Sequence, residues 1–163
     1  MKSKLTLILS LILMVCFSSA VVGYDADLAQ SYAKLFQPVA GAKAGKALHL
    51  VTPEKLIKDL QKGKPVVTLD IRTPNEFGVF GMTLPDSMSI PVNDVFLPEN
   101  LDRIPEDKQV VILCQSGARA IAVGIALRHV GFKNVYILKG GLKALSSYLS
   151  AKTANPPKKV AAR

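Results

Sequence analysis

The residues of this chain that could do chemistry lie together in one short segment, Cys114-Gln115-Ser116-Gly117-Ala118-Arg119. A tight loop before a helix points its backbone N–H groups inward, and the helix adds the positive end of its dipole. Arg119 contributes a full positive charge at the far side of the loop. These features stabilise a thiolate, which is the nucleophilic form of cysteine. The segment therefore predicts a nucleophilic cysteine inside a cradle of hydrogen-bond donors.

The length of the loop favours sulfur over phosphorus as the atom that the thiolate attacks. Arg119 follows Cys114 in a C-x4-R pattern, one residue shorter than the C-x5-R loop that holds a tetrahedral phosphate in cysteine phosphatases. The smaller ring suits a single extra sulfur atom better. A thiol-redox or arsenate-handling role shares the nucleophile and is a second enzyme hypothesis. Cleavage of the N-terminal segment would remove Cys16, and the mature chain would then lack a resolving cysteine for this role.

Two predicted elements position this loop. Residues 109–113 form a short apolar, β-branched run that is typical of a buried strand. Residues 120–130 carry apolar side chains at helical spacing and end before Gly131, which is a good helix C-cap. The predicted motif is therefore strand, tight loop, helix, with Cys114 at the carboxyl end of the strand.

The rest of the chain alternates strand and helix patterns. This alternation predicts the α/β fold class, with a mostly parallel central sheet flanked by helices. Ligands of such sheets bind beyond the carboxyl ends of the strands, where we expect both Cys114 and Asp70. The other predicted strands are residues 48–51, 66–71, 87–90 and 134–138, and predicted helices follow Thr52 and Thr73 and span residues 142–149.

The chain is expected to contain one folded domain with an extension at each end. Residues 1–20 have the basic start, the short apolar run and the small residues of a secretory signal peptide. Cleavage would release a secreted protein without stable membrane insertion, whereas an uncut segment would anchor the chain in the membrane. We predict a helical lead-in and linker at residues 21–47, the domain at residues 48–150 and a flexible basic tail at residues 151–163.

The composition narrows the possible partners. A formal net charge of +9 favours small anionic molecules. The lysines are scattered and form no stripe with aromatic residues, so we expect no nucleic-acid partner. Cys114, His49 and His129 lack the spacing of metal ligands, so we expect neither a metal nor another cofactor. Nothing in the sequence demands more than a monomer.

Beyond the loop, a set of short motifs resembles the rhodanese domain of sulfurtransferases. The resemblance runs from Leu48 to Leu149, and with a signal peptide in front the chain is similar to the small periplasmic single-domain thiosulfate sulfurtransferases of bacteria. It implies a location in the bacterial periplasm. The matching motifs, besides the loop, are Leu69-Asp70-Ile71-Arg72, Pro74-Asn75-Glu76-Phe77, Ile90-Pro91, Gly131-Phe132, Val135-Tyr136 and Leu138-Lys139-Gly140-Gly141-Leu142.

The resemblance implies a double-displacement reaction. Cys114 would take the outer sulfur from thiosulfate or a similar small anionic donor, and a thiol or cyanide would then take it from the cysteine persulfide. Arg119 would orient the donor. The alternative is a non-catalytic sulfur carrier or protein-binding module that docks a partner through residues 24–47. The residues expected to cradle the persulfide are Gln115, Ser116, Gly117, Ala118 and Arg119.

The resemblance also assigns supporting roles and exposes two departures from the family pattern. Asp70 and Arg72 match a pair that holds the loop in place, and we expect Arg72 to pair with Glu76. Thr83 stands where many members have a histidine, and Gln115 stands where active members often have a basic residue. One fewer positive charge in the loop weakens the expected binding of a dianion such as thiosulfate.

Overall fold

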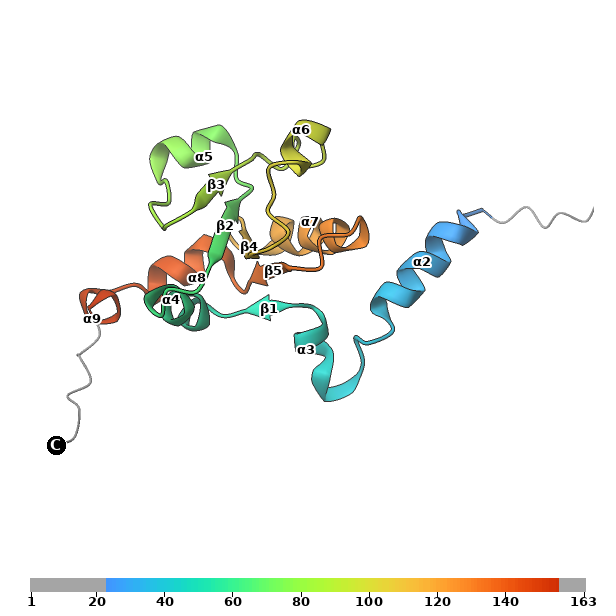
Figure 1. The fold of residues 1–163 in the computed structure, drawn as a ribbon, viewed down its shortest axis with the longest axis horizontal. Coiled ribbons are helices and arrows are strands. Elements are labelled where there is room, and N and C mark those ends of the chain that lie inside the picture. Colours follow the sequence, from blue (N-terminus) through green and yellow to red (C-terminus); the bar gives the residue numbers. More distant parts are fainter. Residues whose placement is uncertain (1–22, 156–163) are drawn as a thin grey trace, which may run out of the picture. The chain divides into compact units, whose positions relative to one another are not determined.

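The computed structural model describes residues 23–155 (Figure 1). The chain divides into two units, with the boundary between Leu35 and Phe36. The helix α2 (Ala26–Phe36) has no buried residue and confirms the helix predicted in the lead-in. The predicted signal peptide and the end of the predicted tail lie outside the described residues. No helix within residues 23–155 is both long enough and apolar enough to span a lipid bilayer.

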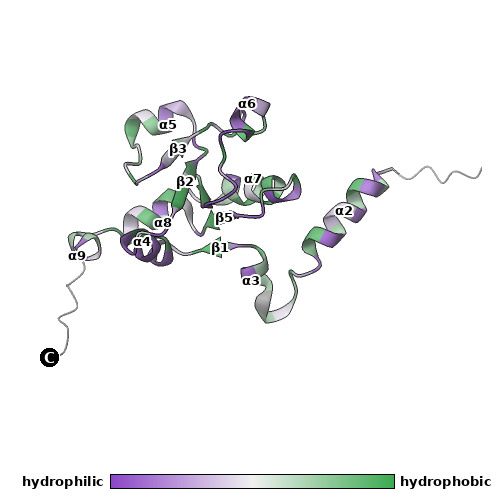
Figure 2. Cartoon of the chain, viewed as in Figure 1, coloured by the Kyte–Doolittle hydropathy of each residue, from purple (hydrophilic) through white to green (hydrophobic). Residues whose placement is uncertain are grey.

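The second unit is built on a five-stranded sheet in which all neighbouring strands are parallel. The strand order is β1-β5-β4-β2-β3, so β4, which precedes the cysteine loop, is the central strand. Figure 2 shows that β2 and β5 are strongly hydrophobic, as expected of parallel strands covered on both faces. The predicted α/β class is confirmed. The strands are β1 (Leu50–Val51), β2 (Val66–Asp70), β3 (Ser87–Ser89), β4 (Gln109–Leu113) and β5 (Val135–Leu138).

Helices cover both faces of this sheet. The helical elements that follow α2 are η1 (Gly41–Lys43, a 3-10 turn), α3 (Ala44–Ala47), α4 (Pro53–Gln61), α5 (Pro74–Val79), α6 (Pro98–Leu101), α7 (Ala118–His129), α8 (Gly141–Tyr148) and α9 (Ala151–Ala154). On one face, α7 packs on β4 and β5 over a core that includes Ile112 and Leu127. On the other face, α4 and α8 pack together over a core that includes Leu56 and Leu113. Ile112 and Leu113 belong to different cores because successive side chains of a strand point to opposite faces.

Two helices begin at the threonines from which we predicted their start. Thr52 Oγ1 accepts the N–H of Lys55 at the start of α4, and Thr73 Oγ1 accepts the N–H of Glu76 at the start of α5. The carboxylate of Glu76 accepts the N–H of Thr73 in return, which completes the predicted capping box. The cap starts α5 immediately after β2, so α5 lies at the carboxyl edge of the sheet.

Two segments that we predicted to be irregular contain short helices. The linker expected before residue 48 holds η1 and α3, and the flexible tail expected from residue 151 begins with α9. Ser150 and Thr153 exchange hydrogen bonds as a capping box at the start of α9. The carbonyl of Thr153 also accepts a hydrogen bond from Gln61 of α4 at 2.8 Å. The local sequence pattern does not predict this contact, because the two segments are far apart in the sequence.

We expect Gly124→Ala to destabilise the domain. A Cβ at this position of α7 would lie 2.7 Å from Cγ1 of Ile137 and 3.2 Å from Cγ2 of Ile112. Overpacking should lower the free energy of unfolding by about 1–2 kcal/mol, even after the gain in helix propensity. Gly45→Ala in α3 has nothing within 4 Å of the new Cβ and should be neutral or stabilising. Urea unfolding measures both, and a G124A protein as stable as wild type would contradict this packing.

Candidate active site

The residues of the predicted site meet at the carboxyl edge of the two central strands. In the parallel register of β2 and β4, Asp70 lies opposite Leu113, and Cys114 follows directly. The common edge predicted for Asp70 and Cys114 is therefore present. Strand register alone brings these two residues together, although they are far apart in the sequence.

The thiol of Cys114 is enclosed by its own loop. The residue is 1% exposed, and its Sγ accepts a hydrogen bond from the N–H of Gly117 at 3.2 Å. Gly117 is the N-cap of α7 and has a φ of +95°, a conformation that glycine adopts without steric cost. A backbone donor and the N-terminus of a helix thus lie at the sulfur. A backbone N–H donor at the N-terminus of a helix is an arrangement that favours anionic groups in general.

The first turn of α8 holds the loop through its backbone. The N–H of Leu142 donates to the carbonyl of Cys114 at 2.8 Å, and the next N–H of α8 donates to the next carbonyl of the loop at 3.0 Å. Gly141 allows this approach, because a Cβ there would collide with the Cys114 carbonyl oxygen and lie 2.7 Å from the nitrogen of Gly117. The sequence placed Gly141 only within a motif that matches the family pattern. Its contact with the cysteine loop is a site feature that sequence reasoning missed.

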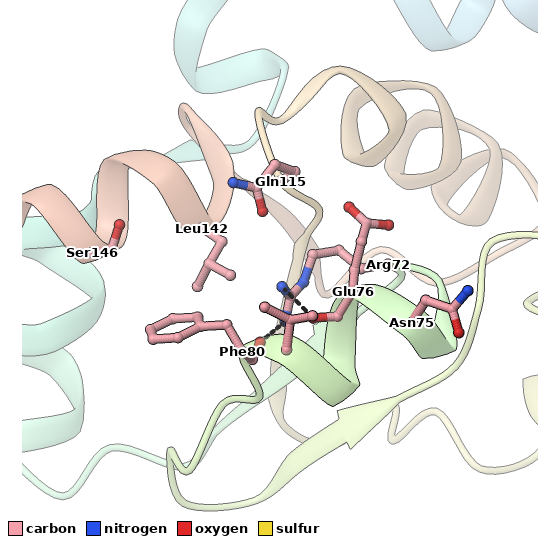
Figure 3. A pocket seen from close by; sticks show the side chains of 8 residues that line it. Arg72, Asn75, Glu76, Phe80, Gln115, Leu142 and Ser146 are labelled. Atoms are coloured by element: carbon pink, nitrogen blue, oxygen red, sulfur yellow. Dashed lines mark hydrogen bonds between the residues drawn. The ribbon is translucent and has the colours of Figure 1, made fainter.

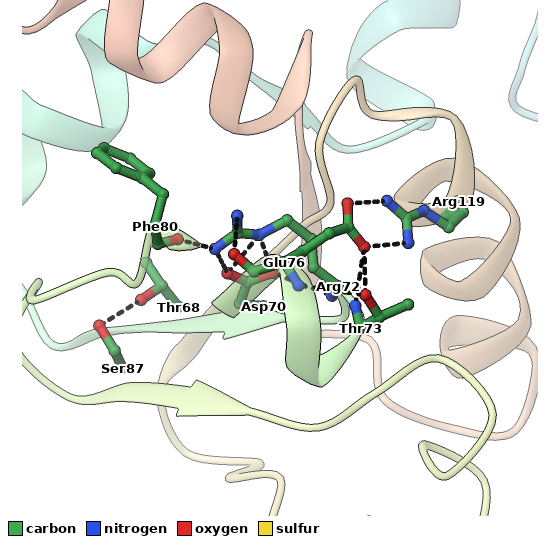
Figure 4. A network of polar contacts seen from close by, with 8 residues as sticks. All are labelled: Thr68, Asp70, Arg72, Thr73, Glu76, Phe80, Ser87 and Arg119. Atoms are coloured by element: carbon green, nitrogen blue, oxygen red, sulfur yellow. Dashed lines mark hydrogen bonds and ion pairs between the residues drawn. The ribbon is translucent and has the colours of Figure 1, made fainter. Parts of the chain in front are cut away.

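A buried ion pair lies at the end of β2 (Figure 4). Asp70 and Arg72 are each 1% exposed. The Arg72 side chain donates to both carboxylate oxygens of Asp70, with the shortest bond from Nη2 at 2.7 Å, and the Arg72 backbone N–H donates to the same carboxylate at 3.1 Å. Buried charges are tolerated where each has a close, hydrogen-bonded partner. The geometry supports the structural role predicted for this pair.

Arg72 also fixes α5, but through the backbone of that helix. Its Nη2 donates to the carbonyl of Phe80 at 2.7 Å, and its Nη1 donates to the carbonyl of Glu76 at 3.4 Å. The guanidinium carbon lies 5.5 Å from the centre of the Phe77 ring. The expected side-chain pair between Arg72 and Glu76 is therefore wrong, because the Asp70 carboxylate and the carbonyls of Glu76 and Phe80 take the donors of Arg72.

The carboxylate of Glu76 instead binds Arg119, the last residue of the loop motif. Arg119 Nη2 donates to Oε1 at 2.7 Å and Nη1 donates to Oε2 at 2.9 Å, so a two-bond pair joins α5 to α7. The hydrogen bonds from Arg119, followed by that from the N–H of Thr73, lower the pKa of Glu76 to about 2. Glu76 in turn raises the pKa of Arg119, and Cys114 adds a smaller effect. The positive charge of Arg119 is thus paired with Glu76, the acid that the sequence led us to expect beside Arg72.

The histidines do not join this site. The His49 ring stacks on Tyr136 with 4.7 Å between centroids, and its Nδ1 lies 3.2 Å from the Val135 carbonyl oxygen. Burial lowers the pKa of His49. His129 is the last residue of α7. Across residues 23–155, no three His, Cys, Asp or Glu side chains are grouped to hold a metal ion.

A cavity of about 600 Å³ opens beside the loop (Figure 3). Leu142 and the ring of Phe80 point toward one another across it, and Gln115 borders it from the loop. A smaller cavity of about 210 Å³ shares Phe80, Leu142 and Ser146 and continues along α8. The residues that line the larger cavity are Arg72, Asn75, Glu76, Val79, Phe80, Gln115, Leu142 and Ser146.

Comparison with known proteins places this geometry in a family. The model of the rhodanese-like domain matches residues 52–148, more than half of the chain. The chain belongs to the rhodanese family. A sulfurtransferase of Allochromatium vinosum is 36% identical over 94 residues, 58% of this chain and 84% of the relative. The probable adenylyltransferase/sulfurtransferase MoeZ of Mycobacterium tuberculosis is 28% identical over 94 residues, 58% of this chain but only 24% of that relative.

The solved structures agree with this assignment. The human single-domain sulfurtransferase TSTD1 superposes with a TM-score of 0.53 at 19% identity, over 63% of this chain and 98% of that protein. At this identity the likeness shows the fold. A rhodanese-like domain with a sulfurtransferase among its relatives supports sulfur transfer in general.

In this rhodanese-like domain, we expect Gly141→Ala to disrupt the Cys114 loop. Gly141 has a φ of +59° and no space for a Cβ against the loop backbone, so the variant should lose about 2–4 kcal/mol of unfolding free energy. Gly63→Ala is the matched control, because Gly63 has a φ of +68° with nothing within 4 Å. It should lose only about 1 kcal/mol, the strain of the backbone alone. Equal losses in thermal unfolding would refute a role for the close approach.

The Glu76–Arg119 pair should make the stability of the domain depend on acid pH. Glu76 has a pKa of about 2 in the folded protein and an ordinary value of 4.5, so its contribution is complete above pH 4.5 and is lost as the pH falls through about 2. We expect Glu76→Gln to cost about 1–2 kcal/mol at neutral pH, because its side chain is partly exposed. Denaturant unfolding of both proteins between pH 7 and pH 3 should show this difference shrink below pH 4.5. A constant difference would contradict the pairing.

Proposed function

We propose that the protein is a rhodanese-type sulfurtransferase in which Cys114 carries the transferred sulfur as a persulfide. The observation that supports it best is the hydrogen bond that the buried Cys114 Sγ accepts from the N–H of Gly117, at the N-terminus of α7. A fixed donor there stabilises the attacking thiolate first and the persulfide anion afterwards. Membership of the rhodanese family supports the general reaction, and the loop supplies the atom that performs it.

The first half-reaction moves a sulfane sulfur onto the enzyme. The Cys114 thiolate attacks the outer sulfur of thiosulfate or a similar small anionic donor and forms a new S–S bond. The S–S bond of the donor breaks, and its electron pair leaves with sulfite. The backbone of residues 115–119 surrounds the transferred sulfur in this proposal, while Asp70 and Arg72 hold the elements behind it.

The second half-reaction returns the enzyme to its starting state. A thiol or cyanide attacks the outer sulfur of the persulfide, the bond between that sulfur and the Cys114 sulfur breaks, and the thiolate is restored. The acceptor leaves as its own persulfide, or as thiocyanate when cyanide is the acceptor. Atoms and electrons balance over the cycle without an added oxidant, reductant or metal ion.

The cellular setting is part of the proposal. The signal-peptide pattern of residues 1–20 supports a mature protein in the bacterial periplasm, where a small anionic sulfur donor and a thiol acceptor would be its partners. We propose that it works as a monomer, without a cofactor and without binding nucleic acid.

Replacing the nucleophile tests this function directly. We expect wild-type residues 21–163 to gain one sulfur atom when treated with excess thiosulfate and to lose it again with cyanide, whereas Cys114→Ser should gain none. Intact-protein mass spectrometry measures the change, and thermal unfolding verifies that the variant remains folded. Sulfur transfer by folded C114S would contradict this assignment. A wild-type protein that takes up sulfur from no donor at all would favour the non-catalytic binding module instead.

A further inference from the structure

The cavity beside the loop offers a donor no unpaired positive charge from its walls. Of the lining residues, only Arg72 and Glu76 are charged. Arg72 is buried and bound to Asp70, and Glu76 holds Arg119 through both carboxylate oxygens. Gln115, the first residue after the cysteine, adds an uncharged amide. The Glu76 carboxylate is ionised at neutral pH, as any ordinary glutamate is, and its hydrogen bonds with Arg119 lower its pKa further, to about 2.

The wall of the cavity is instead apolar and accessible. At the end of α5, Val79 is 90% exposed and Phe80 is 56% exposed. Phe80 and Leu142 face the same space, and the smaller cavity extends this surface along α8 (Figure 3). A volume of about 600 Å³ lies in the range of pockets that hold organic molecules. It is far larger than the five atoms of thiosulfate require.

We propose that Glu76 determines which sulfur donor this site accepts. By holding Arg119, it disfavours the thiosulfate dianion and favours a sulfane-sulfur donor with an apolar organic body and at most one negative charge. The body lies against Val79, Phe80 and Leu142 while the terminal sulfur meets the cysteine. This inference rests on the proposed sulfur transfer through Cys114.

Organic thiosulfonates, R–SO₂–S⁻, are the simplest probes of this donor class. The Cys114 thiolate attacks their terminal sulfur, the S–S bond of the donor breaks, and the electron pair leaves with the sulfinate R–SO₂⁻. The products are the Cys114 persulfide and the sulfinate, so the step balances as it does for thiosulfate. Only the charge and the organic body of the donor differ.

The test compares thiosulfate, methanethiosulfonate and benzenethiosulfonate as donors to cyanide. Because the interaction free energy of a unit charge doubles for a dianion, Glu76→Gln should raise kcat/KM about tenfold for thiosulfate and only about threefold for methanethiosulfonate. Because each donor is compared with itself between variants, differences in intrinsic reactivity among the donors cancel from the kcat/KM ratios. Glu99→Gln makes the same charge change on α6, outside the cavity, and should leave all three values unchanged.

Two further substitutions separate charge from shape and do not depend on the folding of E76Q. Val79→Lys places a positive charge on the exposed wall and should raise kcat/KM for thiosulfate several-fold relative to benzenethiosulfonate. Val79→Thr, which has nearly the same shape, should not. Phe80→Ala should remove most of the preference for the benzene over the methane body, about tenfold.

The outcomes distinguish this inference from the function on which it rests. If wild type transfers sulfur but neither E76Q nor V79K shifts the donor preference, Glu76 does not select the donor. A fall in thiosulfate activity in E76Q would likewise overturn the inference, because the pair would then be helping the dianion to bind. Absence of Cys114-dependent transfer from all three donors would overturn the proposed function itself.

Discussion

The buried ion pair between Asp70 and Arg72 is the constraint on which the rest of the site depends. Two charges at 1% exposure are costly to desolvate, so each must keep the other as its partner. Arg72 has more donors than Asp70 can accept, and it places the remainder on the carbonyls of Glu76 and Phe80. The pair therefore fixes α5 against the end of β2. With α5 fixed, the Glu76 carboxylate lies within reach of Arg119.

The cysteine loop is held from two sides by backbone atoms. α7 begins at the loop and supplies the Gly117 N–H to the Cys114 sulfur, while the first turn of α8 donates to the loop carbonyls. Both contacts involve glycines with positive φ, Gly117 and Gly141. A side chain at Gly141 would overlap the loop backbone, whereas a Cβ at Gly117 would lie 3.3 Å from the nitrogen of Gly140. The field at the sulfur thus comes from fixed dipoles, which need no reorganisation when charge develops there.

The charged side chains around this loop are paired with one another. Arg119 organises the approach of α5 to α7 by binding Glu76. In the donor selection that we propose, the same bonds weaken its attraction for an anion. A site whose charges are paired in this way recognises its ligand mainly by shape and apolar contact, and Val79, Phe80 and Leu142 supply that surface. The general reaction belongs to the family, whereas in our proposal the choice of donor follows from how this chain pairs its charges.

The sequence by itself determined the parallel α/β sheet, the strand–loop–helix around Cys114, the threonine caps of α4 and α5, and the common edge of Asp70 and Cys114. The strands, the loop motif and the caps follow from residues close together in the chain, and the common edge follows from the single direction that all strands of a parallel sheet share. Only the tertiary structure decided that Glu76 binds Arg119 rather than Arg72, that Gly141 touches the cysteine loop, and that Gln61 donates a hydrogen bond to α9. Each of these contacts joins segments distant in the sequence, and their partners are chosen by strand register and helix packing, which local patterns do not encode.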